Sequence, residues 1–343
     1  MQRIRQALES VKTQAYVAAS RVSLDGRWPL QEVLDAIIAQ TGNQVRLQTD
    51  ELGANKTVEL HVADAPFWQV LQEIMNQADL QLVAFATTEQ ELVLGPREGV
   101  APPPAWFDGP VRIDPLFTQA TLNFRSALVG QLQVSALVSW EPRLQPVFLQ
   151  IPMDKLEAEA GGKVYDSATP DAAPEIPLNV GGSSTQIDLL LDRPPRSVAQ
   201  LDSLRGRLVM AIPSEKHQYE FERFSSGARQ SQKYGDVTVT LEGARRNGPV
   251  WEFRILVEFG SPEGALESFR GWVLSNQAYL LDPQGRRLEN VGFQTYAITP
   301  SAVGIAYLFQ INGDPDLHRL VYESPAGIVR YTLDYELEDI PLP

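Results

Sequence analysis

Three histidines are the first candidates for chemistry in this sequence. His61 falls on a predicted strand, His217 in a predicted linker and His318 in a predicted loop. Histidine binds metals and moves protons near neutral pH, but either role needs a second histidine or a carboxylate at suitable spacing. No such spacing occurs here, so ordinary surface or edge positions explain these residues best. A single-metal site assembled from distant segments stays open.

Carboxylates near the C-terminus are the second candidates. Asp334, Glu336 and Glu338 alternate with apolar residues along a predicted strand. Carboxylates on one strand face can bind calcium or serve as the acid and base of a glycosidase. A solvated strand face explains the same alternation, and it is the interpretation we favour.

A predicted loop upstream of that strand holds a third candidate. Asn312, Asp314 and Asp316 place oxygen ligands at alternate positions, which hints at calcium. A calcium loop also needs a bidentate glutamate at a fixed distance, and this loop lacks one. Turn chemistry accounts for the same residue types, so we predict no metal site.

The familiar motifs of catalysis are absent from the sequence. It has no His-Glu-x-x-His, Gly-x-Ser-x-Gly, phosphate-loop or dinucleotide-binding glycine pattern. It also has no cysteine, which excludes disulfides, thiolate nucleophiles and cysteine metal sites. We therefore expect no catalytic residue and no cofactor. A hydrolase whose residues meet only in the fold is the least favoured alternative.

Length and charge narrow the class of protein further. A chain of 343 residues suggests two or three domains. Its 29 basic and 43 acidic residues give a net charge of −14, which makes nucleic acid and anionic membrane surfaces poor partners. No apolar run of about 18 residues, the length that spans a bilayer, occurs. We expect no membrane insertion, and a soluble protein that either stays in the cytoplasm or has lost a signal peptide.

Two matching helix patterns organise residues 22–94. The first opens with Pro29 and the second with Pro66, and in each the apolar residues recur at i, i+3, i+4, i+7 and i+8. Alternating apolar residues predict short strands before, between and after the helices, with a closing hairpin turn at residues 87–89. The predicted order is β-α-β-β-α-β-β, which is an α+β domain.

The same residues resemble a known domain. The first helix pattern with Gly42 behind it, the strand Thr57–Val62 and the second helix pattern are similar to the short N-terminal domain that secretins and TonB-dependent transducers share. The resemblance covers residues 22–94 and rests on hydrophobic pattern. It implies a periplasmic interaction module without catalytic residues. The chain has no TonB-box-like tail or plug, so we expect it to use the module without being the pore itself.

Aromatic residues are the candidates for partner contact. Trp68 lies off the apolar stripe of the second helix, where the first helix carries Gln31. Exposed tryptophan is typical of interfaces, so we predict that Trp68 faces a partner or a neighbouring domain, with packing on the following proline-rich linker as an equal alternative. Trp106 and Phe107, in that linker, are further candidates for partner contact.

The rest of the chain is predicted to be mainly β. Gly95–Pro110 holds five prolines and is typical of a semi-rigid spacer. Beyond it, apolar residues alternate in many short runs, which favours two β-sandwich-like domains, or one large sandwich as the alternative. Residues 152–183 are predicted to be a long loop or an inserted excursion. The predicted division is an N-terminal helix (1–21), the secretin-like domain (22–95), the linker (96–110) and two β domains (111–215 and 216–343).

These observations lead to one favoured function and one alternative. We expect a non-enzymatic bacterial cell-envelope protein, periplasmic or secreted, that acts through protein-protein contact as a scaffold or assembly component. The alternative is binding of a polysaccharide by the β-rich half, because sugar rings stack on exposed tryptophan and tyrosine. The sequence does not identify the partner.

Overall fold

The protein is mostly β, with several separate sheets. Its structure is a computed structural model that describes residues 16–53, 55–84, 90–99, 103–122, 130–178, 181–235, 237–259, 273–274, 276–299, 301–311 and 313–343. Within these ranges two α-helices lie complete, α2 (Leu30–Thr41) and α3 (Phe67–Ala78). Most of the helix predicted at 1–21, and the turn predicted at 87–89, fall outside the described residues.

The chain forms two compact units, which are described separately below. The first unit contains residues 1–174, 178–210 and 330–343, and the second contains 175–177 and 211–329. Two long strands, β14 (Gln200–Phe221) and β22 (Arg319–Pro341), contribute residues to both units. The last 14 residues, 330–343, therefore belong to the first unit, whereas alternation along the sequence places them in the final β domain.

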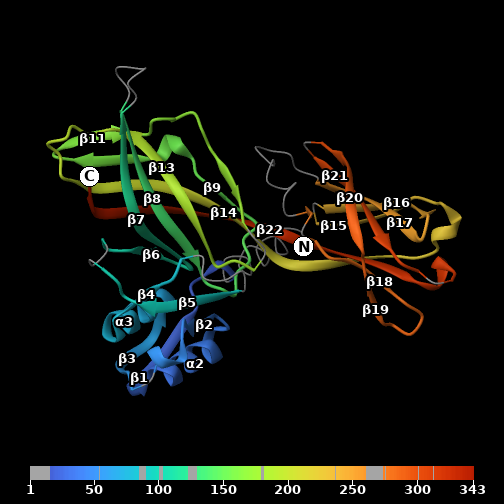
Figure 1. Ribbon diagram of the computed structural model, residues 1–343, viewed down its shortest axis with the longest axis horizontal. Coiled ribbons are helices and arrows are strands. Elements are labelled where there is room, and N and C mark those ends of the chain that lie inside the picture. Colours follow the sequence, from blue (N-terminus) through green and yellow to red (C-terminus); the bar gives the residue numbers. More distant parts are fainter. Residues whose placement is uncertain are drawn as a thin grey trace, which may run out of the picture. The chain divides into compact units, whose positions relative to one another are not determined.

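The N-terminal region, residues 21–96, contains both helices and two small sheets (Figure 1, blue to cyan). Strand β1 (Arg21–Pro29) pairs antiparallel with β3 (Thr57–Pro66). Strand β5 (Glu91–Pro96) lies between β2 (Gln44–Leu47) and β4 (Leu80–Leu82), parallel to the first and antiparallel to the second. A 3-10 turn covers Asp50–Leu52.

Local sequence explains where these helices begin and end. Pro29 and Pro66 each stand one position before a helix, where the fixed φ of proline suits the extended chain. Gly42 ends α2 in the left-handed conformation, with φ 74°, and its N–H donates to the carbonyl of Ile38. Asp79 ends α3 in the same way at φ 54°, a cap that the sequence did not signal.

The apolar stripes of both helices meet in one core. Leu34 and Ile37 of α2 and Leu71 and Ile74 of α3 are fully buried together with the inward residues of β1 and β3. Each such side chain contributes about 1.5–3 kcal/mol when it leaves water. This core holds the N-terminal region together.

The β-rich part of the first unit contains two sheets. One has the order β13-β8-β7-β6, all antiparallel, with β13 at Ser184–Asp192, β8 at Gly130–Trp140, β7 at Val111–Leu122 and β6 at Trp106–Asp108. The other contains β11 (Lys163–Asp166), β10 (Glu157–Ala160), β14 and β22 in that order, with β9 (Phe148–Gln150) beside β14. The ring of Trp106 on β6 meets that of Tyr335 on β22 at 6.4 Å, so the two sheets contact each other.

Two predictions about irregular segments need correction. Residues 152–183 are not a long loop, because they include a 3-10 turn at Met153–Lys155 and the strands β10, β11 and β12 (Glu175–Pro177). These strands have four residues or fewer, too short for a clear period. The end of the predicted spacer at 96–110 is also structured, since its residues Trp106–Asp108 pair with β7.

The second unit is built on a five-stranded antiparallel sheet. Its order is β15-β16-β17-β21-β20, with β15 at Gln230–Tyr234, β16 at Val237–Asn247, β17 at Val250–Phe259, β21 at Ala302–Phe309 and β20 at Gly292–Ile298. Strands β18 (Ala278–Leu281) and β19 (Arg287–Glu289) pair beside β22. Buried aromatic rings, including Phe253, Phe309, Tyr307 and Tyr322, fill its core.

Candidate functional site

Trp68 is buried and does not contact a partner in this fold. Its side chain has 0% exposed surface, packs edge-on against Phe67 and lies under the guanidinium of Arg112, 5.9 Å from the ring. Arg112 of β7 lies over its ring, and α3 also contacts β6, so the side chain is not available to a partner in this fold. The neighbouring strands belong to the same unit, and β6 (Trp106–Asp108) lies in the segment predicted to be the proline-rich linker.

The other two predicted contact residues are partly covered. Trp106 packs against Tyr335, and Phe107 packs against the core of the N-terminal region. Arg112 also lies 5.9 Å from the ring of Phe107, so one guanidinium is close to the rings of both Phe107 and Trp68. These aromatic residues therefore help to hold the N-terminal region against β6 and β7.

The three histidines lie apart and serve different local contacts. His61 is exposed and pairs with Asp25 at 2.7 Å, and this hydrogen bond raises the pKa of the imidazole. His217 lies on β14, not in a linker, and stacks on Tyr234 with ring centres 3.9 Å apart. His318 is buried, with Nδ1 3.2 Å from the carbonyl of Asp314. Within the described ranges, no three histidine or carboxylate side chains are placed to hold a metal ion.

Two of the three alternating carboxylates of the last strand, Asp334 and Glu336, pair with arginines. Asp334 accepts a hydrogen bond from Arg207 at 2.6 Å, and Glu336 accepts one from Arg205 at 2.9 Å. Arg207 lowers the pKa of Asp334 through this hydrogen bond. All four side chains are well exposed, so they form a charged ladder on the surface of the sheet.

The predicted oxygen-rich loop is a turn. Asp314 caps the 3-10 turn Pro315–Leu317 by accepting from the N–H of Asp316 at 3.0 Å, and Asp316 accepts from the N–H of Ser225 at 2.7 Å. Both carboxylates are thus used in backbone contacts. Asn312, the third member of the pattern, lies outside the described residues.

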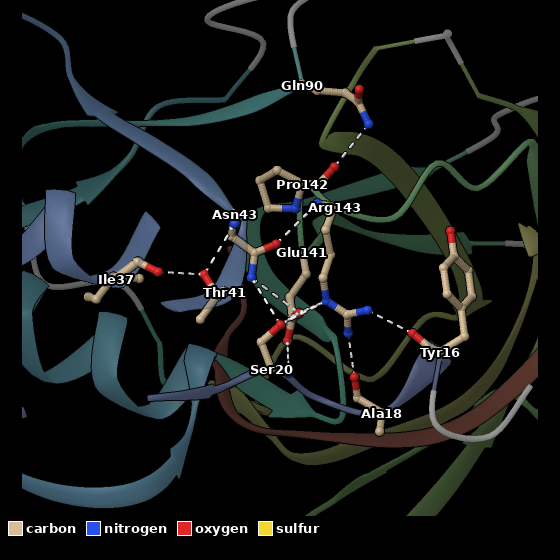
Figure 2. Close-up of polar contacts among 10 residues, drawn as sticks. All are labelled: Tyr16, Ala18, Ser20, Ile37, Thr41, Asn43, Gln90, Glu141, Pro142 and Arg143. Carbon is tan, nitrogen blue, oxygen red and sulfur yellow. Dashed lines mark hydrogen bonds and ion pairs between the residues drawn. The ribbon is translucent and has the colours of Figure 1, made fainter. Parts of the chain in front are cut away.

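A buried polar cluster, absent from the sequence-based predictions, lies in the first unit (Figure 2). The Glu141 cluster consists of Ser20, Asn43, Glu141 and Arg143. Ser20 directly precedes β1, Asn43 lies between α2 and β2, and Glu141 and Arg143 follow β8. It therefore joins segments that are 98 to 127 residues apart in the chain.

The carboxylate of Glu141 is completely buried and receives four hydrogen bonds. Its Oε1 accepts from the N–H of Ser20 at 2.9 Å. Its Oε2 accepts from Ser20 Oγ at 2.5 Å, from Arg143 Nε at 2.6 Å and from Asn43 Nδ2 at 3.2 Å. A buried charge is tolerated only when such donors replace water, and hydrogen bonds to ionised groups are the strongest available.

Arg143 extends the cluster to the chain that enters β1. Its Nη1 donates to the carbonyl of Tyr16 at 2.7 Å, and its Nη2 donates to the carbonyl of Ala18. Its backbone N–H donates to Asn43 Oδ1 at 3.0 Å, so Asn43 is bound through both ends of its amide. One arginine thus fixes the segment 16–20 and the end of α2 together.

Backbone contacts position the two charged residues. The N–H of Glu141 donates to the carbonyl of Pro110 at 2.9 Å, and its own carbonyl accepts from Leu144 in a tight turn. Gln90 donates to the carbonyl of Pro142 at 3.0 Å. Glu141 and Arg143 therefore lie in a backbone turn held by hydrogen bonds, one residue before and one residue after Pro142.

Chemically, the cluster is built to hold segments together. Ser20 Oγ donates to a carboxylate, as an activated nucleophile would, but it also accepts from Arg143 Nε at 2.7 Å. Glu141 has no exposed surface through which a substrate could reach it. The sequence gives little sign of this cluster, because its members are distant in the chain. The one local feature is a glutamate and an arginine on either side of a proline, directly after an apolar strand.

Comparisons with known proteins add no assignment to this geometry. No known protein family, no curated protein and no solved structure matches the chain. Among the helices that the structure describes, none has the length and apolar character needed to cross a membrane.

Proposed function

We propose that this chain is a non-enzymatic scaffold of the bacterial cell envelope, periplasmic or secreted, that works through contacts with another protein. The observation that carries the proposal is the Glu141 cluster. Burying a carboxylate costs desolvation free energy, which the four hydrogen bonds to this fully buried side chain offset. These hydrogen bonds link the N-terminal region to the β-rich part of the first unit. A scaffold needs such fixed geometry, because its surfaces must face a partner together.

The resemblance of residues 22–94 to the secretin and TonB-transducer domain supports the envelope location and the contact function. The elements of this region follow the order β1, α2, β2, β3, α3, β4, β5, which is the order that the apolar periods predict and is compatible with the resemblance. The assignment of an α+β interaction module is part of this proposal.

The surface for a partner is proposed to be strand β20 of the second unit. β20 is the last strand of its five-stranded sheet, so one of its backbone edges is unpaired within that sheet. Its residues Phe293 and Ile298 are 46% and 53% exposed. Natural edge strands are usually protected by charges or bulges. β20 has an irregularity in its pairing between Thr295 and Ala297 but carries no charged residue, so its apolar edge favours pairing with a strand of another protein.

Site-specific cross-linking tests this proposal. A photo-cross-linking residue at Phe293 is compared with one at Lys233, an exposed position on β15 at the opposite edge of the same sheet. In native envelope extract, the residue at 293 should capture one protein that the residue at 233 does not. That protein, once purified, should bind the wild-type chain and lose binding to Ile298→Lys.

Two results would overturn the proposal. One is equal capture from positions 293 and 233. The other is a defined turnover activity that the folded Glu141→Gln variant lacks, which would make the cluster a catalytic site.

A further inference from the structure

A cavity of about 360 Å³ lies in the first unit where α3 and β4 meet β7. Most of its wall is apolar, with Leu80, Leu82, Pro103, Pro104 and Leu116 among the lining residues. Its size is within the range of small-molecule sites, about 300–1,000 Å³. The cavity shares no residue with the Glu141 cluster.

One polar wall of the cavity is a preorganised arginine. Arg112 has a side chain only 6% exposed, and it donates to both carboxylate oxygens of Asp114 at 2.8 and 2.7 Å. Its Nη1 donates to Gln72 Oε1 at 2.6 Å. The charges of Arg112 and Asp114 therefore balance, and the guanidinium is fixed in place.

A second arginine is not balanced in this way. Nη2 of Arg97 donates to Asn76 Oδ1 at 3.0 Å and to the carbonyl of Leu80 at 3.2 Å, both of which are neutral. Its closest carboxylate is that of Asp79, 3.9 Å away and 76% exposed, and its buried Nε has no hydrogen-bond partner. Such an exposed ion pair is weak.

Beside the balanced Arg112–Asp114 pair, the cavity therefore has a second cation, Arg97, whose carboxylate partner Asp79 is distant, exposed and outside the cavity lining, in a chain of net charge −14. Among the described residues that line it, Asp114 is the single carboxylate, and Arg112 already neutralises it. We propose that this cavity binds a small molecule with an apolar body and one carboxylate, with the carboxylate on Arg97 and the body among the prolines and leucines. This ligand site is independent of the proposed protein contact.

Three eight-carbon probes test the charge requirement on the wild-type protein. Octanoate, octan-1-ol and octylamine have equal apolar bodies and differ in the charge of the head. Isothermal titration calorimetry should show saturable binding of octanoate at one site, with octan-1-ol at least about tenfold weaker because it cannot form a charge-assisted bond, and octylamine not bound. Equal binding of octanoate and octan-1-ol, or no saturable octanoate binding, would overturn the proposal.

Three variants locate the site. Arg97→Gln should raise the dissociation constant of octanoate at least about tenfold, whereas Asp114→Asn, which removes the opposing charge, should lower it. Arg193→Gln is the matched control, because Arg193 lines a second cavity of about 580 Å³ in the same unit, and it should have no effect. Weaker binding in both Arg97→Gln and Asp114→Asn would point to a collapsed cavity, and weaker binding in Arg193→Gln to the other one. Either result contradicts the proposal.

Discussion

Glu141 and Glu336 are both paired with an arginine, yet they are in opposite surroundings. The side chain of Glu141 is 0% exposed and holds donors from three separate segments, whereas that of Glu336 is 42% exposed and faces Arg205 across two strands. An exposed pair keeps its water and is screened by salt. A buried pair has lost that water, so the loss of one partner leaves the other charge without compensation.

The difference shows which charges hold this molecule together. The ladder of Arg205, Arg207, Asp334 and Glu336 keeps the sheet surface solvated, and its pairs can be exchanged with small consequences. The Glu141 cluster fixes the segment before β1 and the end of α2 against the turn after β8. Four predictions, given from the largest expected effect to the smallest, test this contrast.

Glu141→Ala should be the most damaging change. It leaves the charge of Arg143 without its carboxylate partner and removes the acceptor of the Ser20 N–H, at a cost of about 3–5 kcal/mol in the free energy of unfolding. Urea denaturation followed by tryptophan fluorescence measures it, because Trp68 and Trp140 lie in the core of the first unit. A loss no larger than that of the matched exposed variant Glu336→Ala would contradict the contrast.

Asn43→Ala should have an intermediate effect. The variant removes one donor to Glu141 and the acceptor for the N–H of Arg143, but it keeps the Glu141–Arg143 ion pair. Unsatisfied buried groups cost about 1–3 kcal/mol. The same denaturation series measures this loss, and an effect equal to that of Glu141→Ala would mean that the ion pair itself contributes nothing.

Arg207→Gln should change a pKa with little change in stability. The hydrogen bond from Arg207 holds the pKa of Asp334 below its ordinary value. The stabilisation from Asp334 is therefore present above about pH 4, its unfolded pKa, and is lost as pH falls through the folded pKa. An NMR titration should place the Asp334 pKa of the variant closer to the ordinary value. An unchanged pKa would show that the pair does not form in solution.

The ion pair of His61 should have the smallest effect on stability, and its pH dependence should be opposite in sign to that of Asp334. Asp25 and Glu59 raise its pKa, so its contribution is present below about pH 6.5 and is lost as pH rises through the folded pKa. NMR titration of Asp25→Asn should give a lower His61 pKa than that of the wild type. Because the imidazole is exposed, the urea midpoint should not change between the two proteins. A clear shift in the midpoint would be evidence against a purely surface role.

The sequence predicted the local elements better than the contacts between them. Helices α2 and α3 were predicted because their apolar residues follow the helical period. The end of α2 was predicted because a glycine directly after a helix is typical of a left-handed cap, as at Gly42. The burial of Trp68 was not predicted because periodicity identifies one buried face of a helix, whereas Arg112 and the contact with β6 cover a second face of α3. Short strands such as β10 gave no usable period.

The Glu141 cluster could not be predicted from the sequence, because its members come together only in the tertiary fold. Glu141 and Arg143 lie next to each other in the chain, but Ser20 and Asn43 are brought to them only by the tertiary fold. The surface ladder could have been predicted, because Arg205 and Arg207 alternate along their strand just as Asp334 and Glu336 do. Both sets of contacts join segments that are distant in the chain, but charges that alternate along a strand leave a period in the sequence, whereas single polar residues such as Ser20 and Asn43 leave none.

Hydrogen exchange at two backbone amides tests the central claim most directly. The N–H of Ser20 donates to Glu141 and that of Arg143 donates to Asn43, so both amides depend on side chains of the Glu141 cluster. NMR exchange rates are compared between wild type and Glu141→Gln, with amides of residues 237–247 in the second unit as the internal reference. We expect both amides to exchange slowly in the wild type and much faster in the variant, while the reference amides stay unchanged. Fast exchange in the wild type, or equal rates in the two proteins, would show that the cluster does not hold these segments together.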